Sequence, residues 1–165
     1  MEIDRPAGPV TPQVLCAGIL VADVLARPVS RLPVPGTLLP IDDIQFHPGG
    51  CAVNTAITLA RLGVPTGVAG RVGQDGFGDF LLSRLQRDGV QTRGVTRDSS
   101  APTSATVVCV PEGADRSLLH CRGANDRFAP DQIDRTLLDG IRIFHMAGVF
   151  IMERMQGPAL AGLFR

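Results

Sequence analysis

Lysine is absent from this chain, and all 16 basic residues are arginine. Codon bias in a GC-rich genome explains this most simply, yet the absence also excludes several kinds of chemistry. These residues provide no Schiff-base lysine, no P-loop lysine and no lysine of the protein-kinase type. Because 16 acidic residues balance the arginines, the formal net charge is zero. We therefore expect neither nucleic acid nor an anionic membrane as a partner.

Paired cysteines and long apolar runs are also lacking. The four cysteines, Cys16, Cys51, Cys109 and Cys121, are far apart and form no C-x-x-C pair, so buried reduced thiols are expected. The longest apolar run, residues 14–22, is too short to span a bilayer. Because the N-terminus has no basic-then-apolar signal pattern, the expected location is cytoplasmic.

The remaining composition is that of one globular domain, with 165 residues of which 44% are hydrophobic and 19% charged. Hydrophobic runs and helical spacing alternate along the chain, which predicts an α/β fold with a mainly parallel sheet and crossover helices. Buried strands are expected at residues 14–20, 66–72 and 141–148, and helices at residues 53–62, 75–89 and 129–140. In the second of these helices, Asp75 is the expected N-terminal cap.

Two segments interrupt this alternation. Residues 27–46 begin with a proline-rich stretch and continue as an extended piece, whereas residues 103–122 read as a hairpin of two short strands. We predict that both segments project from the main sheet as a small β lid. The last residues, 153–165, read as the start of a further helix, so the sheet is expected to be incomplete.

Two glycines directly precede the helix at residues 53–62, within "FHPGGCAVNTAITLARLG". A turn needs only one glycine, so Gly49 and Gly50 suggest that a small molecule approaches the backbone. Asp23 is either an ordinary turn aspartate or a ligand contact at a strand end, and Asn54 is either a helix cap or a ligand-facing amide. A carboxylate and an amide in one cleft would suit a polyhydroxylated molecule.

Other kinds of site receive less support. His47, His120 and His145 are scattered, and their spacing does not group them as metal ligands. The serines include no nucleophile elbow. The stretch "GQDGFG" reverses the order of the dinucleotide fingerprint, so a nicotinamide-dependent half-domain is a weak hypothesis.

The stretch "HPGGCAVNTAITLARLGVPTGVAGRVGQDGFGDFLLSRLQRDGV" resembles the N-terminal signature of the ribokinase-like (PfkB) carbohydrate kinases. "CAGILVADVL" is similar to the first strand of that family, with its sugar-binding aspartate at Asp23. Residues 27–46 and 103–122 are similar to the strands of its sugar-covering lid. The resemblance runs from about residue 14 to residue 165 and implies a three-layer α/β fold, with residues 1–13 as a tail.

The resemblance also implies a substrate site. In this sequence its residues would be Asp23, Gly49, Gly50, Asn54 and Asn125. Asp23 and Asn54 would hold sugar hydroxyls, the glycines would let the sugar approach the backbone, and Asn125 in "RGAN" would lie beside the lid. The strand around Met146 lacks the acidic substrate contact of the family, which argues against ribose as the substrate.

The late "GAGD"-type motif that carries the catalytic aspartate of these kinases does not occur in the 165 residues. The resemblance therefore implies that catalytic and nucleotide-binding residues lie beyond Arg165, that the cofactors are ATP and Mg²⁺, and that this chain alone is inactive. It further implies a sugar or nucleoside as substrate and a homodimer formed through the lid. The alternative is a non-catalytic sugar-binding or interaction module that ends at residue 165.

Overall fold

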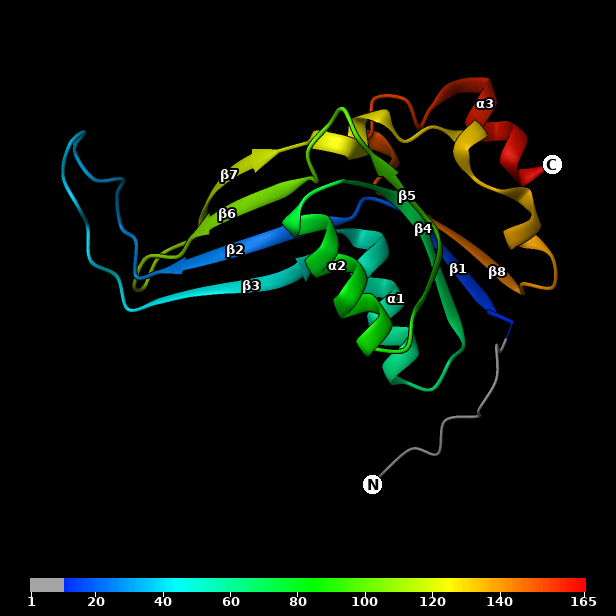
Figure 1. Cartoon of the computed structure of the whole chain (residues 1–165), viewed down its shortest axis with the longest axis horizontal. Helices are drawn as coiled ribbons and strands as arrows, with labels where there is room; N and C mark the ends of the chain where they lie inside the picture. The colour runs from blue at the N-terminus through cyan, green and yellow to red at the C-terminus, as the bar shows by residue number, and fades with distance from the viewer. Residues whose placement is uncertain (1–10) are drawn as a thin grey trace.

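A computed structural model of the protein describes residues 11–165, so most of the predicted N-terminal tail lies outside the described residues. The described chain forms two four-stranded sheets, which we call the main sheet and the lid sheet (Figure 1). The main sheet has the order β5 (Gln91–Asp98), β4 (Thr66–Gly73), β1 (Val14–Gly18), β8 (Ile143–Ala147). The lid sheet has the order β3 (Asp43–Gly49), β2 (Val21–Arg27), β6 (Ala105–Cys109), β7 (Ser117–Cys121).

All three strand pairs of the main sheet are parallel, and apolar side chains cover both of its faces. One face packs against the helices α1 (Cys51–Arg61) and α2 (Gly76–Arg87). The other face packs against the segment after the lid, through Phe128, Ile133, Met152 and Met155. A parallel sheet that is buried on both faces requires near-continuous apolar strands, and β1 is buried at every position. The predicted three-layer, mainly parallel α/β fold is confirmed.

The two helices of the first layer form where the apolar spacing predicts them. The Asp75 side chain accepts a hydrogen bond of 2.9 Å from the Gly78 backbone N–H and so caps α2, as predicted. In α1 the buried side chains recur on the face that packs on β1 and β4.

The lid sheet projects away from the rest of the molecule, and residues 28–42 form its distal loop (Figure 1). The predicted hairpin is present because β6 and β7 pair antiparallel. The lid sheet extends closer to the main sheet than the predicted segments, since β2 begins at Val21 and β3 ends at Gly49. Only two residues separate the end of β1 at Gly18 from the start of β2.

One predicted helix is wrong. Residues 129–140 form two separate 3₁₀ turns, η2 (Pro130–Gln132) and η3 (Arg135–Leu138), in place of an α-helix. Ile133 and Asp134 between them are extended. The Asp134 carboxylate accepts hydrogen bonds from the backbone N–H and the hydroxyl of Thr136, and Ile133 is buried in the core. Local side-chain bonding and burial of one apolar residue therefore outweigh the helical pattern.

Two strands were not predicted. Strand β5 lies at the edge of the main sheet, is half-buried along most of its length and carries Gly94 beside a register shift, so it lacks the apolar run of a central strand. Strand β2 contains Asp23, for which a turn was one of the two interpretations, and it continues the chain from β1 directly into the lid. Within residues 11–165, no helix has the length and apolar character to cross a membrane.

Candidate functional site

Asp23 lies inside strand β2, so its interpretation as a residue of a turn is wrong. The strand register places it beside His47 on β3 and beside Thr106 on β6, and Thr106 in turn pairs with His120 on β7. Because residues paired across a sheet point to the same face, these four side chains form one polar row across the lid sheet. We call the face that carries them the polar face.

The carboxylate of Asp23 is half-buried on that face. Burial raises the pKa of Asp23, while the neighbouring Thr106 hydroxyl and the charges of His120, His47 and Arg116 act in the opposite direction. A partly desolvated carboxylate with few protein donors gains most from a ligand that supplies hydroxyl donors. Asp23 can therefore act as an acceptor for a polyhydroxylated molecule.

Gly49 lies against Asp23. A Cβ added at residue 49 would stand 2.1 Å from Asp23 Oδ2, a distance that no real side chain could tolerate. The position of the Asp23 carboxylate thus depends on the absence of a side chain at residue 49. The sequence suggested that Gly49 lets a ligand approach the backbone. In the structure, the Asp23 side chain lies against Gly49.

Gly50 has two reasons to be glycine. Its φ of +90° is unfavourable for residues with a side chain, and an added Cβ would stand 2.4 Å from the Ile19 carbonyl oxygen. Gly50 thus packs the start of α1 directly against the connection between β1 and β2. Gly49 thus allows a close contact within the lid sheet, and Gly50 allows a close contact with the connection between the lid sheet and the main sheet.

Asn54 lies one turn into α1, where its backbone N–H donates to the Gly50 carbonyl oxygen at 2.9 Å and its side chain is exposed. It is therefore not the N-cap, which is Gly50. Its exposed amide remains available to a ligand at the start of the helix. A cleft shared by Asp23 and Asn54 stays a prediction.

Asn125 lies in the 3₁₀ turn η1 (Gly123–Arg127), immediately after the lid, and its side chain is 3% exposed. Its Oδ1 accepts from the Leu20 backbone N–H at 3.1 Å, and its Nδ2 donates to the Leu20 carbonyl oxygen at 3.0 Å. Both ends of the amide are thus bonded to the connection between β1 and β2. Asn125 holds the base of the lid against the main sheet, and its polar atoms already have protein partners.

A small cavity of about 140 Å³ lies between this connection and the lid. Its lining combines apolar residues with polar ones, namely Ile19, Val21, Ile151, His120, Arg122, Asn125 and Asp126. Of the predicted site residues, Asn125 lines this cavity. His120, Arg122 and Asp126 were not predicted, because the strand register that relates His120 to Asp23 is not visible in the sequence.

The connection from β5 of the main sheet to β6 of the lid sheet is also fixed by hydrogen bonds. The Thr103 hydroxyl donates to Asp75 at 2.6 Å and accepts from the Gly73 backbone N–H at 2.8 Å, while the Thr103 backbone N–H donates to Asp75 at 2.7 Å. One residue further, the Ser104 hydroxyl donates to the Cys121 carbonyl oxygen. The start of α2 and the start of β6 therefore form one rigid junction.

No group of three or more potential metal ligands comes together within residues 11–165. The four cysteines are free; Cys16 and Cys109 are buried, as expected, but Cys51 and Cys121 are exposed. Burial raises the pKa of Cys16 to about 11, so this thiol is protonated and unreactive at neutral pH.

A profile described as pfkB family carbohydrate kinase matches residues 11–164. The chain is 30% identical to a fructokinase of Solanum tuberosum over 107 residues, which are 64% of this chain and 34% of that protein. Among solved structures, a fructokinase from Xylella fastidiosa superposes with a TM-score of 0.69 and 29% identity, covering 83% of this chain and 41% of that one. A ribokinase of Arabidopsis thaliana, solved with ribose and ATP, gives a TM-score of 0.64 and 29% identity and covers 70% and 38% of the two chains.

These similarities cover most of this chain but well under half of each relative. The described residues match about a third of the potato protein and about two fifths of the bacterial structure.

Proposed function

The chain belongs to the pfkB family of carbohydrate kinases, and on that premise we propose that it forms the sugar-binding part of an ATP-dependent kinase. The complete reaction would transfer the γ-phosphate of ATP to a hydroxyl group of a sugar or nucleoside. The observation that carries this proposal is the contact between Asp23 and Gly49, which places a partly buried carboxylate on the polar face of the lid sheet.

The described residues would contribute binding and orientation of the substrate. Asp23 would accept hydrogen bonds from substrate hydroxyls, and the exposed amide of Asn54 would donate or accept from the start of α1. Gly49 and Gly50 would keep the carboxylate and the helix start in place, and Asn125 would act through Leu20 by fixing the lid. Ordered groups of this kind reduce the entropic cost of binding.

The resemblance implies ATP and Mg²⁺ as cofactors, but residues 11–165 do not fit the role of holding them. They contain no cluster of potential metal ligands, and the chain has no lysine for a phosphate. We therefore assign no step of phosphoryl transfer to these residues. We propose that the chain alone binds a sugar without phosphorylating it, since phosphoryl transfer needs a base and preorganised positive groups.

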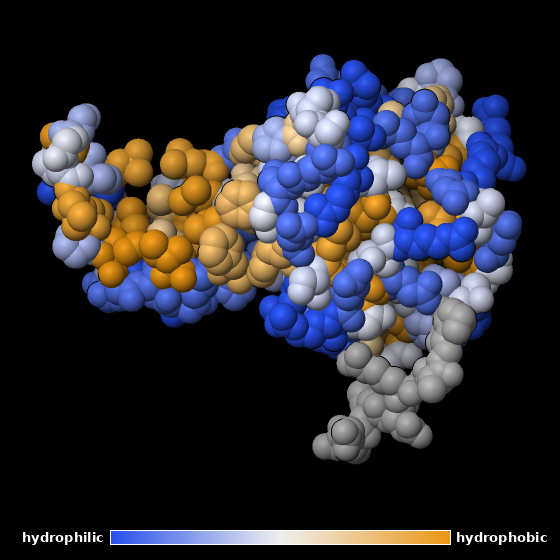
Figure 2. Space-filling model, in the orientation of Figure 1, coloured by the Kyte–Doolittle hydropathy of each residue, from blue (hydrophilic) through white to orange (hydrophobic). Residues whose placement is uncertain are grey.

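We also propose that the lid sheet forms a homodimer through the face opposite to the polar row. On that face, one register row consists of Phe46, Val24, Val107 and Leu119. Figure 2 shows the resulting hydrophobic surface along the projecting sheet. A second copy of the same surface would cover it symmetrically.

The test is a calorimetric titration of residues 1–165 with D-fructose and with D-ribose, followed by the same titrations of Asp23→Ala. We expect the variant to lose roughly 1–3 kcal/mol of sugar-binding free energy, because hydroxyl partners are left unpaired. Magnesium-ATP with either sugar should release no ADP. Unchanged sugar affinity in Asp23→Ala would refute the site, and sustained sugar-dependent ADP release would refute the proposed inactivity. The non-catalytic module stays as the alternative if a chain extended with kinase sequence also remains inactive.

A further inference from the structure

The end of the main sheet away from the lid contains a cavity that the proposed function does not use. Its volume is about 290 Å³, and it lies at the starts of β1 and β4, where Leu15 and Gly67 line it. Strand β1 runs from this cavity towards the lid, so the cavity and Asp23 lie at opposite ends of the sheet (Figure 1). Ligands of open α/β sheets bind outside the carboxyl ends of the strands, so the sugar site does not account for this cavity.

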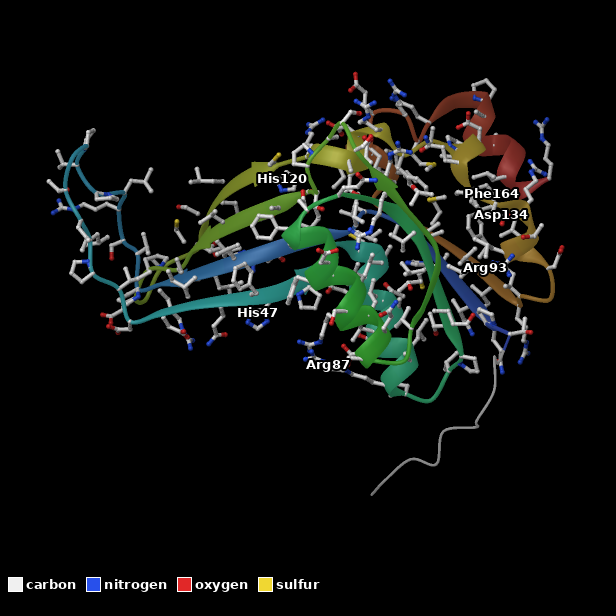
Figure 3. The ribbon with its side chains drawn as sticks, viewed as in Figure 1. His47, Arg87, Arg93, His120, Asp134 and Phe164 are labelled. Carbon is white, nitrogen blue, oxygen red and sulfur yellow. The ribbon has the colours of Figure 1, made fainter. Side chains whose placement is uncertain are left out.

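An irregularity of the sheet brings an arginine to the cavity. Two residues of β5, Thr92 and Arg93, lie opposite the single residue Val68 of β4, which is the pattern of a β-bulge. A bulge changes the direction of the side chains that it carries, and Arg93 lines the cavity. Figure 3 shows Arg93 near Asp134, at the end of the molecule away from His47 and His120.

The guanidinium of Arg93 is exposed and has unused donors. Among residues 11–165, no carboxylate forms an ion pair with Arg93, and no group accepts a hydrogen bond from it. The carboxylate of Asp134 is close but is bonded elsewhere. Hydrogen bonds from the hydroxyl and the backbone N–H of Thr136 lower the pKa of Asp134, and the charge of Arg93 lowers it further. Arg93 can therefore bind a carboxylate from outside the chain.

Hydrogen-bond acceptors line the same cavity from a different segment. The Thr136 hydroxyl donates its proton to Asp134 Oδ1 at 2.8 Å, so it offers only lone pairs to a further partner. Asp139 follows directly after η3, and its carboxylate is exposed and has no hydrogen-bond or ion-pair partner in the part of the chain that the structure describes. A hydroxyl lone pair and a carboxylate together suit an ammonium group.

The apolar part of the lining limits the kind of molecule further. Leu15 is buried and Leu137 is half-buried, and both belong to the core on this face of the main sheet. Two carboxylates, of Asp134 and Asp139, lie around the one guanidinium, so a doubly charged anion such as a phosphate ester is disfavoured. A molecule with one carboxylate, one ammonium group and an apolar body satisfies all parts of the lining.

We propose that this cavity is a second ligand site and that it binds an α-amino acid with an apolar side chain. Arg93 pairs with the carboxylate of the amino acid, and Asp139 and Thr136 accept from its ammonium group. The apolar side chain lies against Leu15 and Leu137. This site is independent of the proposed sugar site.

The test is a calorimetric titration of residues 1–165 with L-leucine and with two analogues that each lack one charged group. Isocaproate lacks the ammonium group, and isoamylamine lacks the carboxylate. We expect saturable binding of L-leucine and about fivefold weaker binding of either analogue, because each loses one exposed charge pair. Isocaproate or isoamylamine binding as tightly as L-leucine would overturn the assignment of a zwitterionic ligand.

Variants assign the two charges to their residues. Arg93→Gln should weaken the binding of L-leucine about fivefold and leave isoamylamine unaffected, whereas Asp139→Asn should weaken L-leucine equally and leave isocaproate unaffected. Arg97→Gln is the matched control on β5, because Arg97 pairs with Asp79 and does not line the cavity. Asp131→Asn is the control for Asp139, since Asp131 is exposed in η2 and does not line the cavity either. Circular dichroism should show the same fold for all four variants.

The outcomes separate this inference from the proposed function. Arg93→Gln and Asp139→Asn should bind D-fructose as the wild type does. If the wild type binds D-fructose but not L-leucine, or if Arg93→Gln binds L-leucine as tightly as Arg97→Gln does, the second site is wrong and the proposed function stands. Binding of L-leucine that only the cavity variants weaken supports the second site, whatever the result for the sugar.

Discussion

The main sheet and the lid sheet each contain four strands, yet they bury them very differently. In the main sheet, apolar layers cover both faces of the strands, and β1 is buried throughout. In the lid sheet, β7 is exposed at every position, and large apolar side chains such as Phe46 and Leu119 are more than half exposed. We therefore expect the main sheet to supply most of the stability of the fold, while the lid sheet exposes one polar face and one apolar face.

This difference in burial predicts which substitutions will lower the free energy of unfolding most. Phe128 is fully buried against the main sheet. We expect Phe128→Ala to lower the free energy of unfolding by about 4 kcal/mol, because it removes buried apolar area and leaves a cavity. Urea denaturation followed by circular dichroism measures this. A loss no larger than that of a lid variant would contradict the assigned roles of the two sheets.

The next largest loss of stability is expected at Asp98, the last residue of β5. Asp98 is 2% exposed and accepts from Arg71, from Arg127 and from both the backbone N–H and the hydroxyl of Ser100. Asp98→Asn should lower the free energy of unfolding by roughly 2–3 kcal/mol, because it leaves the arginines without their charged partner.

The pH dependence of Asp98 offers an independent check. The backbone N–H of Ser100, its hydroxyl and Arg71 hold the pKa of Asp98 well below its usual range. Its folded-state pKa is thus lower than in the unfolded chain, so its contribution is present above about pH 4 and is lost as the pH falls further. Wild type and Asp98→Asn should therefore become more similar in stability below pH 4. A difference that persists unchanged in acid would refute the ion pairs.

Asp23, on the polar face of the lid sheet, should behave in the opposite way. Burial raises its pKa above the unfolded value, so the folded state loses stability as the pH rises through that pKa. Asp23→Asn should therefore raise the free energy of unfolding slightly at neutral pH while it weakens sugar binding. Thermal unfolding and sugar titration of the same variant test both parts. A clear loss of stability would mean that Asp23 is a structural residue.

The smallest effect on folding is expected at the apolar face of the lid. Leu119→Ser changes a side chain that is 54% exposed, so the free energy of unfolding should change by less than about 0.5 kcal/mol. If the lid face forms a homodimer, the same variant should shift the association equilibrium towards monomer in analytical ultracentrifugation. Equal association of wild type and variant would refute the proposed dimer surface.

The comparison also explains which features the sequence could predict. Elements with a strong local signal were found, such as α2 with its Asp75 cap and the lid hairpin. Strand β5 was missed because an edge strand has no continuous apolar run. Residues 129–140 were predicted as a helix because the hydrogen bond that Thr136 donates to Asp134 is not visible in the spacing of apolar residues. Both errors concern segments whose conformation is decided by neighbours and local hydrogen bonds.

The predicted site residues show the same difference between local sequence signals and contacts across strands. Asp23, Gly49 and Gly50 lie close together at the base of the lid, although Asp23 is in a strand and not in a turn. His120 was set aside as one of three scattered histidines, because its relation to Asp23 passes through Thr106 on a third strand. Such a relation depends on strand register, which sequence spacing does not give.

The short connection between β1 and β2 limits how the lid sheet can move relative to the main sheet. The chain enters the lid through Ile19 and Leu20, and Asn125 bonds both backbone groups of Leu20. The chain enters the lid a second time at Thr103, between β5 and β6, where Asp75 fixes it. The chain leaves the lid at Gly50 and again at Arg122, so the projecting sheet is joined to the main sheet at its base, and side-chain hydrogen bonds hold two of these connections. A small tilt at this base therefore becomes a large displacement at the distal loop, whereas Asp23, three residues after Leu20, moves very little.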